Sequence, residues 1–191
     1  SHASRYSLNS MWAWIRYFGA FSNDPSLRLN ADFVDLDPHQ KTILSDDFGM
    51  GMSMHLLADT LDLVGFCDGK YFIDRLSTRI PCKVLPKTSK RGPRKSPDFA
   101  AVDKFGKVHV IECKGTQTGR GYALTQLKSA IAQKQTIDIQ GSLKGESLAT
   151  AFVISGDQKD WESSFIVADP EAEDPLLIVG PDSKNAVLET F

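Results

Sequence analysis

Two carboxylates and a lysine stand around a short predicted hairpin, in a pattern suited to metal-assisted hydrolysis of phosphates. Asp98 precedes one apolar segment of the sequence, whereas Glu112 and Lys114 close the next one. The residues between the two segments are typical of a hairpin with a three-residue loop, in which Gly106 takes the left-handed conformation. A loop of this kind, centred on Phe105, pairs Asp98 with Glu112, so we expect the two carboxylates to lie side by side.

This predicted pair of carboxylates needs a cation. Facing residues of a hairpin have Cβ atoms about 4.5–5.5 Å apart, and carboxylates held that closely repel each other unless a cation lies between them. Mg²⁺ prefers hard oxygen ligands of this kind. Lys114 projects from the same face as Glu112, where its ammonium can orient an attacking water and offset charge on a phosphate. A register shift of one residue would take Asp98 to the other face and break the site.

The opposite face of the second strand is expected to be packed rather than catalytic. Cys113 projects from that face as a packing residue, although its backbone carbonyl oxygen is a candidate metal ligand. His109 shares this face, and we expect it to be a core residue rather than a base.

Helices are predicted on both sides of the hairpin. Residues 45–47 (Ser-Asp-Asp) are expected to cap a helix that runs to about Leu61, in which Gly49 and Gly51 allow close approach to a sheet. The preceding residues 22–44 contain two Asp-Pro turns and are expected to be mostly loop, after a first helix over residues 11–19. A later helix is predicted from the apolar period over residues 122–138.

Short apolar segments typical of strands alternate with these helices. They lie around 79–85 and at 99–103, 107–113, 149–154 and 164–168, with 176–179 as a further candidate. Residues 62–86 are otherwise ambiguous. The order of helix, three strands, helix and strand predicts an α/β domain with two or three layers.

Basic residues gather just before Asp98. The segment 83–95 holds six cations and no acid, although the whole 191-residue chain has a net charge of −2. A local basic run in a mildly acidic protein can contact phosphates, and the alternative is a solvated loop. The candidate phosphate contacts are Lys90, Arg91, Arg94 and Lys95, together with Arg120 in the glycine-rich segment that follows Lys114.

The arrangement over residues 45–155 resembles the PD-(D/E)xK phosphodiesterases, the restriction-endonuclease-like superfamily. Pro97-Asp98 and Glu112-Cys113-Lys114 stand where the signature of that family stands. The resemblance implies an αβββαβ core with a central mixed sheet flanked by helices. It also implies Mg²⁺-dependent hydrolysis of nucleic-acid phosphodiesters, with Mn²⁺ as a substitute metal.

The same resemblance implies roles for individual residues. Asp98 and Glu112 would bind the metal, and Lys114 would position the nucleophilic water. An acid from the first core helix would complete the metal site, and Asp47, or less favourably Asp46, is the match. A polar residue from the later helix would touch metal, water or DNA, and Gln126 and Gln133 share one face of that helix. A capping role for the acids and a solvated face for the glutamines are the alternatives.

The chain is expected to divide into a helical and loop extension (1–44), a nuclease core (45–170) and a C-terminal extension (171–191), with an added strand in the last. Three sparsely spaced cysteines suggest a reducing, cytoplasmic compartment, and no apolar run is long enough for a membrane helix. The expected partner is DNA, with a homodimer or a larger complex as the expected assembly. A bacterial restriction, defence or mobile-element system is implied by the resemblance alone.

Other functions remain open or are disfavoured by the motifs. The first alternative to an endonuclease on DNA is a non-catalytic nucleic-acid-binding module on the same fold. A second alternative is a hydrolase of sugars with paired carboxylates, but Lys114 favours two anions where that chemistry needs one protonated acid. The chain has neither the GxxxxGK[ST] loop of nucleotide triphosphatases nor the GxSxG elbow of serine hydrolases.

Overall fold

The described residues of the computed structural model (15–23, 25–84, 96–134, 136–169 and 176–179) form a mixed six-stranded sheet. The strand order is β1-β3-β4-β6-β7-β8. Only β4 and β6 among these neighbours are parallel, and the other pairs are antiparallel. The strands are β1 (Leu63–Asp68), β3 (Phe99–Asp103), β4 (Val108–Thr116), β6 (Lys144–Val153), β7 (Ser164–Ala168) and β8 (Leu176–Val179).

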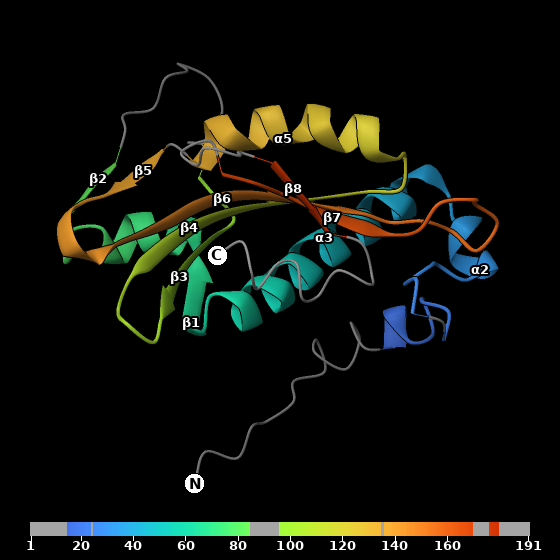
Figure 1. Ribbon diagram of the computed structural model, residues 1–191, viewed down its shortest axis with the longest axis horizontal. Coiled ribbons are helices and arrows are strands. Elements are labelled where there is room, and N and C mark those ends of the chain that lie inside the picture. Colours follow the sequence, from blue (N-terminus) through green and yellow to red (C-terminus); the bar gives the residue numbers. More distant parts are fainter. Residues whose placement is uncertain (1–14, 24, 85–95, 135, 170–175, 180–191) are drawn as a thin grey trace, which may run out of the picture.

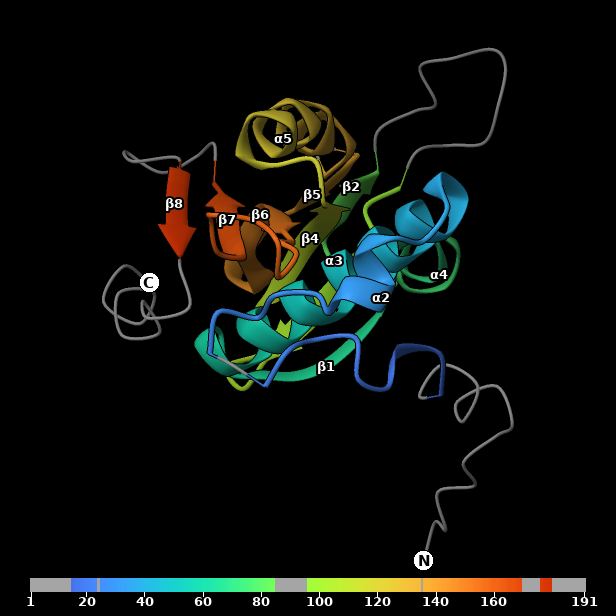
Figure 2. The same cartoon turned by 90° about the vertical axis from the view of Figure 1, so that its right-hand side faces the viewer.

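The sheet lies between two long helices (Figures 1 and 2). Helix α3 (Pro38–Thr60) covers one face, where Leu57 packs against Ile111 and Leu148. Helix α5 (Arg120–Lys134) covers the other face, where Leu127 packs among small residues of β6 and β7. The mixed α/β fold with a central mixed sheet is therefore as the sequence predicts.

Shorter elements extend this framework at its ends. Strands β2 (Cys82–Val84) and β5 (Ile137–Ile139) form a small antiparallel sheet. Helix α4 (Gly69–Tyr71) continues into a π-helical turn (Phe72–Leu76), and a 3₁₀ turn (Gly141–Leu143) precedes β6. Helix α2 (Ala31–Val34) lies directly before α3. In the described residues, no helix has both the length and the apolarity needed to cross a membrane.

Helix α3 starts earlier than the sequence predicts. Its N-cap is Asp37, whose side chain accepts hydrogen bonds from the backbone of His39 and Gln40, and Pro38 occupies the first turn. The prediction that residues 45–47 cap this helix was wrong, because an Asp-Pro pair that was expected to form a turn serves as the cap. Its predicted end near Leu61 is confirmed.

Several other predicted elements differ in their limits. Helix α5 ends at Lys134 rather than Asp138, which lies in strand β5. Strand β4 continues past Cys113 to Thr116, and β6 begins at Lys144, five residues before the predicted start. The strands predicted at 99–103, 164–168 and 176–179 are confirmed.

The segment before α3 packs against the main core. Leu29 is fully buried together with Leu44 of α3 and Phe152 of β6, and the rings of Phe152 and Phe165 stack 4.5 Å apart. The backbone of Leu29 also forms a bridge to Gly156. Part of the predicted N-terminal extension therefore belongs to the same hydrophobic core.

The β3–β4 hairpin has the predicted register. Phe99 faces Ile111 and Ala100 faces Val110, and the same alignment continued by one residue pairs Asp98 with Glu112. Gly106 closes the loop with a φ of +80°, a conformation that favours glycine. The register matters because it decides which side chains share a face.

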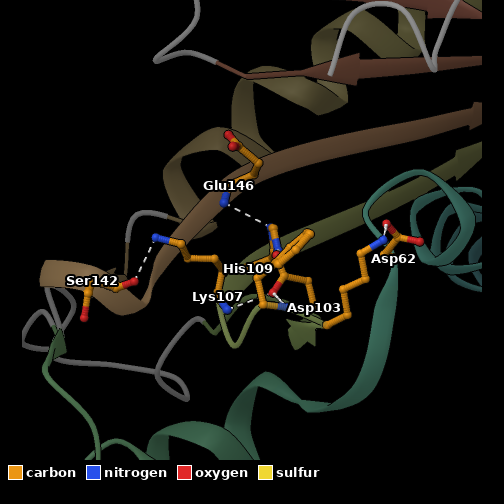
Figure 3. Close-up of polar contacts among 8 residues, drawn as sticks. Asp62, Asp103, Lys107, His109, Ser142 and Glu146 are labelled. Carbon is orange, nitrogen blue, oxygen red and sulfur yellow. Dashed lines mark hydrogen bonds and ion pairs between the residues drawn. The ribbon is translucent and has the colours of Figure 1, made fainter.

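A buried polar cluster fixes the far end of the hairpin (Figure 3). Nε2 of His109 lies 3.3 Å from Oδ2 of Asp103, and Nδ1 of His109 accepts a hydrogen bond from the backbone N–H of Glu146 at 3.0 Å. The backbone N–H groups of Phe105 and Lys107 donate to Oδ1 of Asp103, both at 2.8 Å. His109 is thus a core residue, as predicted, and it ties the loop to the start of β6.

Candidate active site

Asp98 and Glu112 are held together by reciprocal hydrogen bonds. The backbone N–H of Asp98 donates to Oε2 of Glu112 at 3.1 Å, and the backbone N–H of Cys113 donates to Oδ2 of Asp98 at 2.8 Å. Each carboxylate therefore bonds to the strand that carries the other. The predicted side-by-side placement of these two acids is confirmed.

Lys114 joins this pair on the same face of the sheet. Its Nζ lies 2.5 Å from Oε1 of Glu112. The side chain of Glu112 has no exposed surface, whereas that of Lys114 is 23% exposed and so reaches solvent. The three residues that carry the predicted chemistry thus form one cluster, which is buried on the strand side and open at the lysine.

The electrostatics of the cluster reflect this burial. Burial raises the pKa of Glu112 to about 7, with the charge of Asp98 adding to the rise and Lys114 opposing it. Burial also raises the pKa of Asp98, against the hydrogen bond from Cys113 and the charge of Lys114. For Lys114, burial acts to lower the pKa, but the hydrogen bond and charge of Glu112 outweigh it and the net pKa is raised. Lys114 therefore stays protonated at neutral pH.

A close contact between α3 and β4 brings a further acid toward this cluster. A Cβ atom on Gly49 would lie 2.5 Å from the backbone nitrogen of Gly115, and one on Gly115 would lie 1.7 Å from the carbonyl oxygen of Ser45. Both positions therefore require glycine, and the helix rests directly on the strand one residue beyond Lys114. The predicted close approach at Gly49 is confirmed, whereas Gly51 has open space around it and makes no such contact.

The acid that α3 contributes is Asp46 rather than Asp47. Burial raises the pKa of Asp46, and the charge of Lys114 opposes the rise, so Asp46 lies within electrostatic reach of the cluster. Asp46 in turn adds to the rise in the pKa of Asp98. Asp47 instead accepts a hydrogen bond from the Tyr17 hydroxyl, whose pKa is raised to about 12 by burial and by this partner. Of the two candidate acids on α3, Asp46 is therefore the one that interacts with the cluster, and its role as a metal ligand stays a prediction.

Asp68 lies close to the cluster and was missed in the sequence. It ends β1 opposite Phe99, and its charge adds to the rise in the pKa of Asp98. The backbone N–H of Gly69 donates to the carbonyl oxygen of Asp98 at 2.9 Å, which fixes this corner. The available signal was the short apolar run over residues 63–67, because a strand there would have placed Asp68 at its end.

Cys113 packs as predicted. Its side chain contacts the α3 face with Met54, Leu57 and Ile111, and burial raises the pKa of its thiol to about 12. The thiol is therefore protonated at neutral pH and is unsuited to bind a metal. Only its backbone carbonyl oxygen remains as a candidate ligand.

Comparisons of the chain with models of protein families, with curated proteins and with solved structures find no significant match.

The donor set of the cluster suits a hard divalent cation. Mg²⁺ in proteins is commonly held by one or two carboxylates, and water and phosphate oxygens complete its octahedron. Asp98 and Glu112 supply such a pair, and Asp46 is near. The described residues contain no preformed group of three His, Cys, Asp or Glu residues that could hold a metal ion. The ammonium of Lys114 supplies the positive charge next to Glu112 in this structure.

A cavity of about 460 Å³ lies beside Asp46, and the side chains of Asp98, Glu112 and Lys114 are not among its lining residues. It lies between the first half of α3, the segment after Lys114 and the first turns of α5, and Asp46 is on its wall. Gln126, one of the predicted site residues, also lines the cavity. The hydrogen bonds described for Asp98 and Glu112 do not include it. The remaining lining residues are Val34, Pro38, Lys41, Thr42, Ser45, Gly115, Thr116, Gln117, Thr118, Tyr122, Ile154, Gly156 and Lys159.

The predicted nucleic-acid contacts are only partly covered by the structure. Arg120 is exposed at the first residue of α5, beyond the segment that lines the cavity. The basic residues Lys90, Arg91, Arg94 and Lys95 and the side chain of Gln133 lie outside the described residues. Their roles stay predictions from the sequence.

Proposed function

We propose that this protein is a metal-dependent nuclease that hydrolyses phosphodiester bonds of DNA, as an endonuclease of a bacterial restriction, defence or mobile-element system. The observation that carries the proposal is the convergence of Asp98, Glu112 and Lys114 on one face of the sheet. Two carboxylates with an ammonium beside them suit a divalent cation and a phosphate.

The order of elements supports the proposed membership of the PD-(D/E)xK superfamily. Helix α3 is followed by β1, β3 and β4, then by α5 and β6. This is the helix, three strands, helix and strand expected from that resemblance, with α4 and β2 inserted after β1 and β5 inserted before β6. The first core strand is β1, whereas the strand predicted around 79–85 is β2 of the small separate sheet. The β3–β4 hairpin carries the acids and β6 runs parallel to β4.

The chemistry of this proposal can be assigned to the residues of the cluster. Asp98 and Glu112 would hold Mg²⁺ or Mn²⁺, with Asp46 and the carbonyl oxygen of Cys113 as further ligands, and the bound ion would stabilise negative charge on the phosphate. Lys114 donates hydrogen bonds, since its raised pKa keeps it protonated, and it orients a water toward phosphorus. As the water oxygen bonds to phosphorus, the bond from phosphorus to a sugar oxygen breaks. The water releases a proton to solvent and the leaving sugar oxygen takes one up, so the products are a phosphomonoester and a sugar hydroxyl.

Cleavage of a plasmid tests this proposal. The full chain is incubated with Mg²⁺, Mn²⁺ or EDTA, and wild type is compared with Glu112→Gln and Lys114→Ala. We expect metal-dependent cleavage that both substitutions reduce by about 100-fold or more, as is typical when a transition-state contact is lost. Lys104→Ala is the matched control, because Lys104 pairs with exposed Asp62 away from the cluster. Cleavage that survives EDTA and both substitutions would exclude the mechanism.

A non-catalytic nucleic-acid-binding module is the second candidate. Among the described residues, no preformed group of three His, Cys, Asp or Glu residues could hold a metal ion, which leaves room for this candidate, whereas the intact Asp98, Glu112 and Lys114 speak against it. Binding of DNA without cleavage under every metal condition would support this candidate over the nuclease.

A further inference from the structure

We propose that the cavity beside the carboxylates binds one unpaired nucleotide of the DNA, so that the substrate has an extrahelical or single-stranded nucleotide next to the cleaved phosphate. This inference names the substrate class of the proposed nuclease and rests on that function.

The place of the cavity links it to the cluster. Asp46 lies on its wall and within electrostatic reach of Lys114. The segment 115–118, which also lines the cavity, follows Lys114 directly in the chain. Asp46 is the link between the two places, so a nucleotide in the cavity with its phosphate toward Asp46 has that phosphate on the side of Lys114 and Asp98.

The size and shape of the cavity suit a base with its sugar. Its volume of about 460 Å³ falls in the range of pockets for small organic ligands. Base pairs held in a duplex could not enter it, since each base would be stacked on its neighbours and paired to its partner. Only a nucleotide outside the helix can occupy a recess of this kind.

The lining combines apolar surfaces with amide groups. Tyr122 in the first turns of α5 is 50% exposed, and its ring offers a flat surface on which a base can stack. Val34 and Ile154 provide apolar walls, and Gln117 and Gln126 provide amides. Amides can both donate and accept hydrogen bonds, as the edge of an unpaired base requires.

One of these amides lacks a partner. Among the described residues, no group hydrogen-bonds to the buried Oε1 of Gln126. A buried acceptor without a donor is unfavourable, so rotation of this amide toward the cavity to meet a donor on a ligand is favoured. By contrast, Nε2 of Gln117 donates to Oγ of Ser45 at 3.1 Å and to the carbonyl oxygen of Lys41 at 3.3 Å, which holds the α3 wall in place. Gln126 is therefore the amide that is left for a ligand.

The charged residues at the cavity favour one phosphate rather than several. Lys41 and Lys159 line it and can meet phosphate oxygens. Asp157, Asp160 and Glu162 are exposed on the loop that carries Lys159, so a run of phosphates is disfavoured on that side. The cavity thus suits a single nucleotide better than a length of backbone.

Photocrosslinking and affinity measurements test this inference without cleavage. The full chain with Glu112→Gln is mixed in EDTA with oligonucleotides that carry 5-iodouracil, as a single strand, as a perfect duplex and as a duplex with one mismatch at the labelled base. We expect a crosslink to Tyr122 with the single strand and the mismatched duplex but not with the perfect duplex. A crosslink with the single strand alone assigns a single-stranded substrate, and a crosslink with both assigns a flipped nucleotide.

Two added substitutions measure the contribution of the cavity. Tyr122→Ala should weaken binding of the single strand about tenfold, as loss of one stacked base does. Tyr71→Ala is the matched control, because Tyr71 is similarly exposed at 54% but does not line the cavity. Thr118→Trp, which fills the cavity from an exposed position, should weaken binding without lowering the melting temperature.

The results separate this inference from the proposed nuclease. Equal effects of Tyr122→Ala and Tyr71→Ala, full binding by a stably folded Thr118→Trp variant, or crosslinks only outside the cavity would overturn the nucleotide pocket. Because the assay needs neither metal nor hydrolysis, a protein that fails to cleave DNA can still give the crosslink, and one that cleaves can still lack it.

Discussion

The carboxyl group of Glu112 is cut off from solvent, and this isolation gives the site a pH dependence. Burial raises its pKa to about 7, whereas a glutamate in the unfolded chain has a pKa near 4.5. The folded protein binds this proton more tightly than the unfolded chain. The stability that comes from the proton is complete below the unfolded pKa and is lost as the pH rises through about 7.

The melting temperature of the metal-free protein should therefore fall between about pH 4.5 and 7, and Glu112→Gln should flatten this fall. Glu146→Gln is the control, because Glu146 is exposed. Calorimetric scans across this pH range measure the effect. An unchanged slope in Glu112→Gln would contradict the assigned burial.

Lys114 opposes the rise in the pKa of Glu112, so its removal should raise that pKa further. In Lys114→Met, the pH at which Mg²⁺ binding is half complete should move to a more alkaline value. Titration calorimetry at several pH values measures this midpoint. A midpoint that stays in place would show that the lysine does not control the ionisation of Glu112.

For individual residues, the sequence predicted that the carboxylates of Asp98 and Glu112 lie side by side, because the register of a hairpin depends only on a short local segment. Asp98, Glu112 and Lys114 follow from the position of Gly106 and from strand alternation. The choice between Asp46 and Asp47 depends instead on how α3 is rotated on the sheet. That rotation is set by the contact of Gly49 with Gly115, which lies between segments far apart in the sequence.

The close contact of Gly49 with Gly115 fixes the position of helix α3 on strand β4. In an exposed helix interior, Gly→Ala stabilises by about 1 kcal/mol. At Gly49 the added methyl group would meet the backbone of Gly115 and Lys114, so the same change should be destabilising by several kcal/mol and should move Asp46.

Gly51 offers a matched comparison within the same helix. It is exposed with nothing near its Cβ position, so Gly51→Ala should stabilise the protein by about 0.5–1 kcal/mol. Urea unfolding of both variants measures the difference. Similar effects at the two positions would argue against the close contact.

The far end of the hairpin depends on Asp103. Burial acts to raise its pKa, but hydrogen bonds from Lys107, His109 and Phe105 outweigh it, and its net pKa is lowered. Asp103→Asn removes charged hydrogen bonds and should destabilise the protein by about 1–3 kcal/mol at neutral pH, with a smaller difference in acid.

Asp62 provides the control for this substitution, because its ion pair with Lys104 is exposed. Asp62→Asn should change the free energy of unfolding by less than about 1 kcal/mol. Denaturation at pH 7 and pH 3 compares the two variants. Equal losses would mean that the buried cluster in Figure 3 adds little to the hairpin.

Elements that stabilise themselves locally were predicted well, and those that depend on distant partners were not. The β3–β4 hairpin and the end of α3 follow from nearby residues. Strand β1 is ambiguous in the sequence because its residues are apolar on both faces: Val64 and Phe66 are exposed, so no polar alternation marks the strand. Strand β5 was assigned to a helix because its partner, β2, lies more than fifty residues away in the sequence.

At the scale of the whole molecule, the basic segment before Asp98 is predicted from the sequence to contact DNA phosphates. A triple substitution of Arg91, Arg94 and Lys95 by alanine should weaken DNA affinity and reduce the slope of log affinity against log salt by about 2–3, as expected for three lost phosphate contacts. Fluorescence anisotropy at several salt concentrations gives the slope. If the slope does not change, these residues form a solvated loop.

The ammonium of Lys114 beside Glu112 has a consequence for how the protein is handled. The chain carries its own counterion for the buried acid, so folding does not have to await the arrival of a metal. Purification in chelating buffers should leave the architecture intact, and the cation can be added afterwards as an independent switch for reactivity.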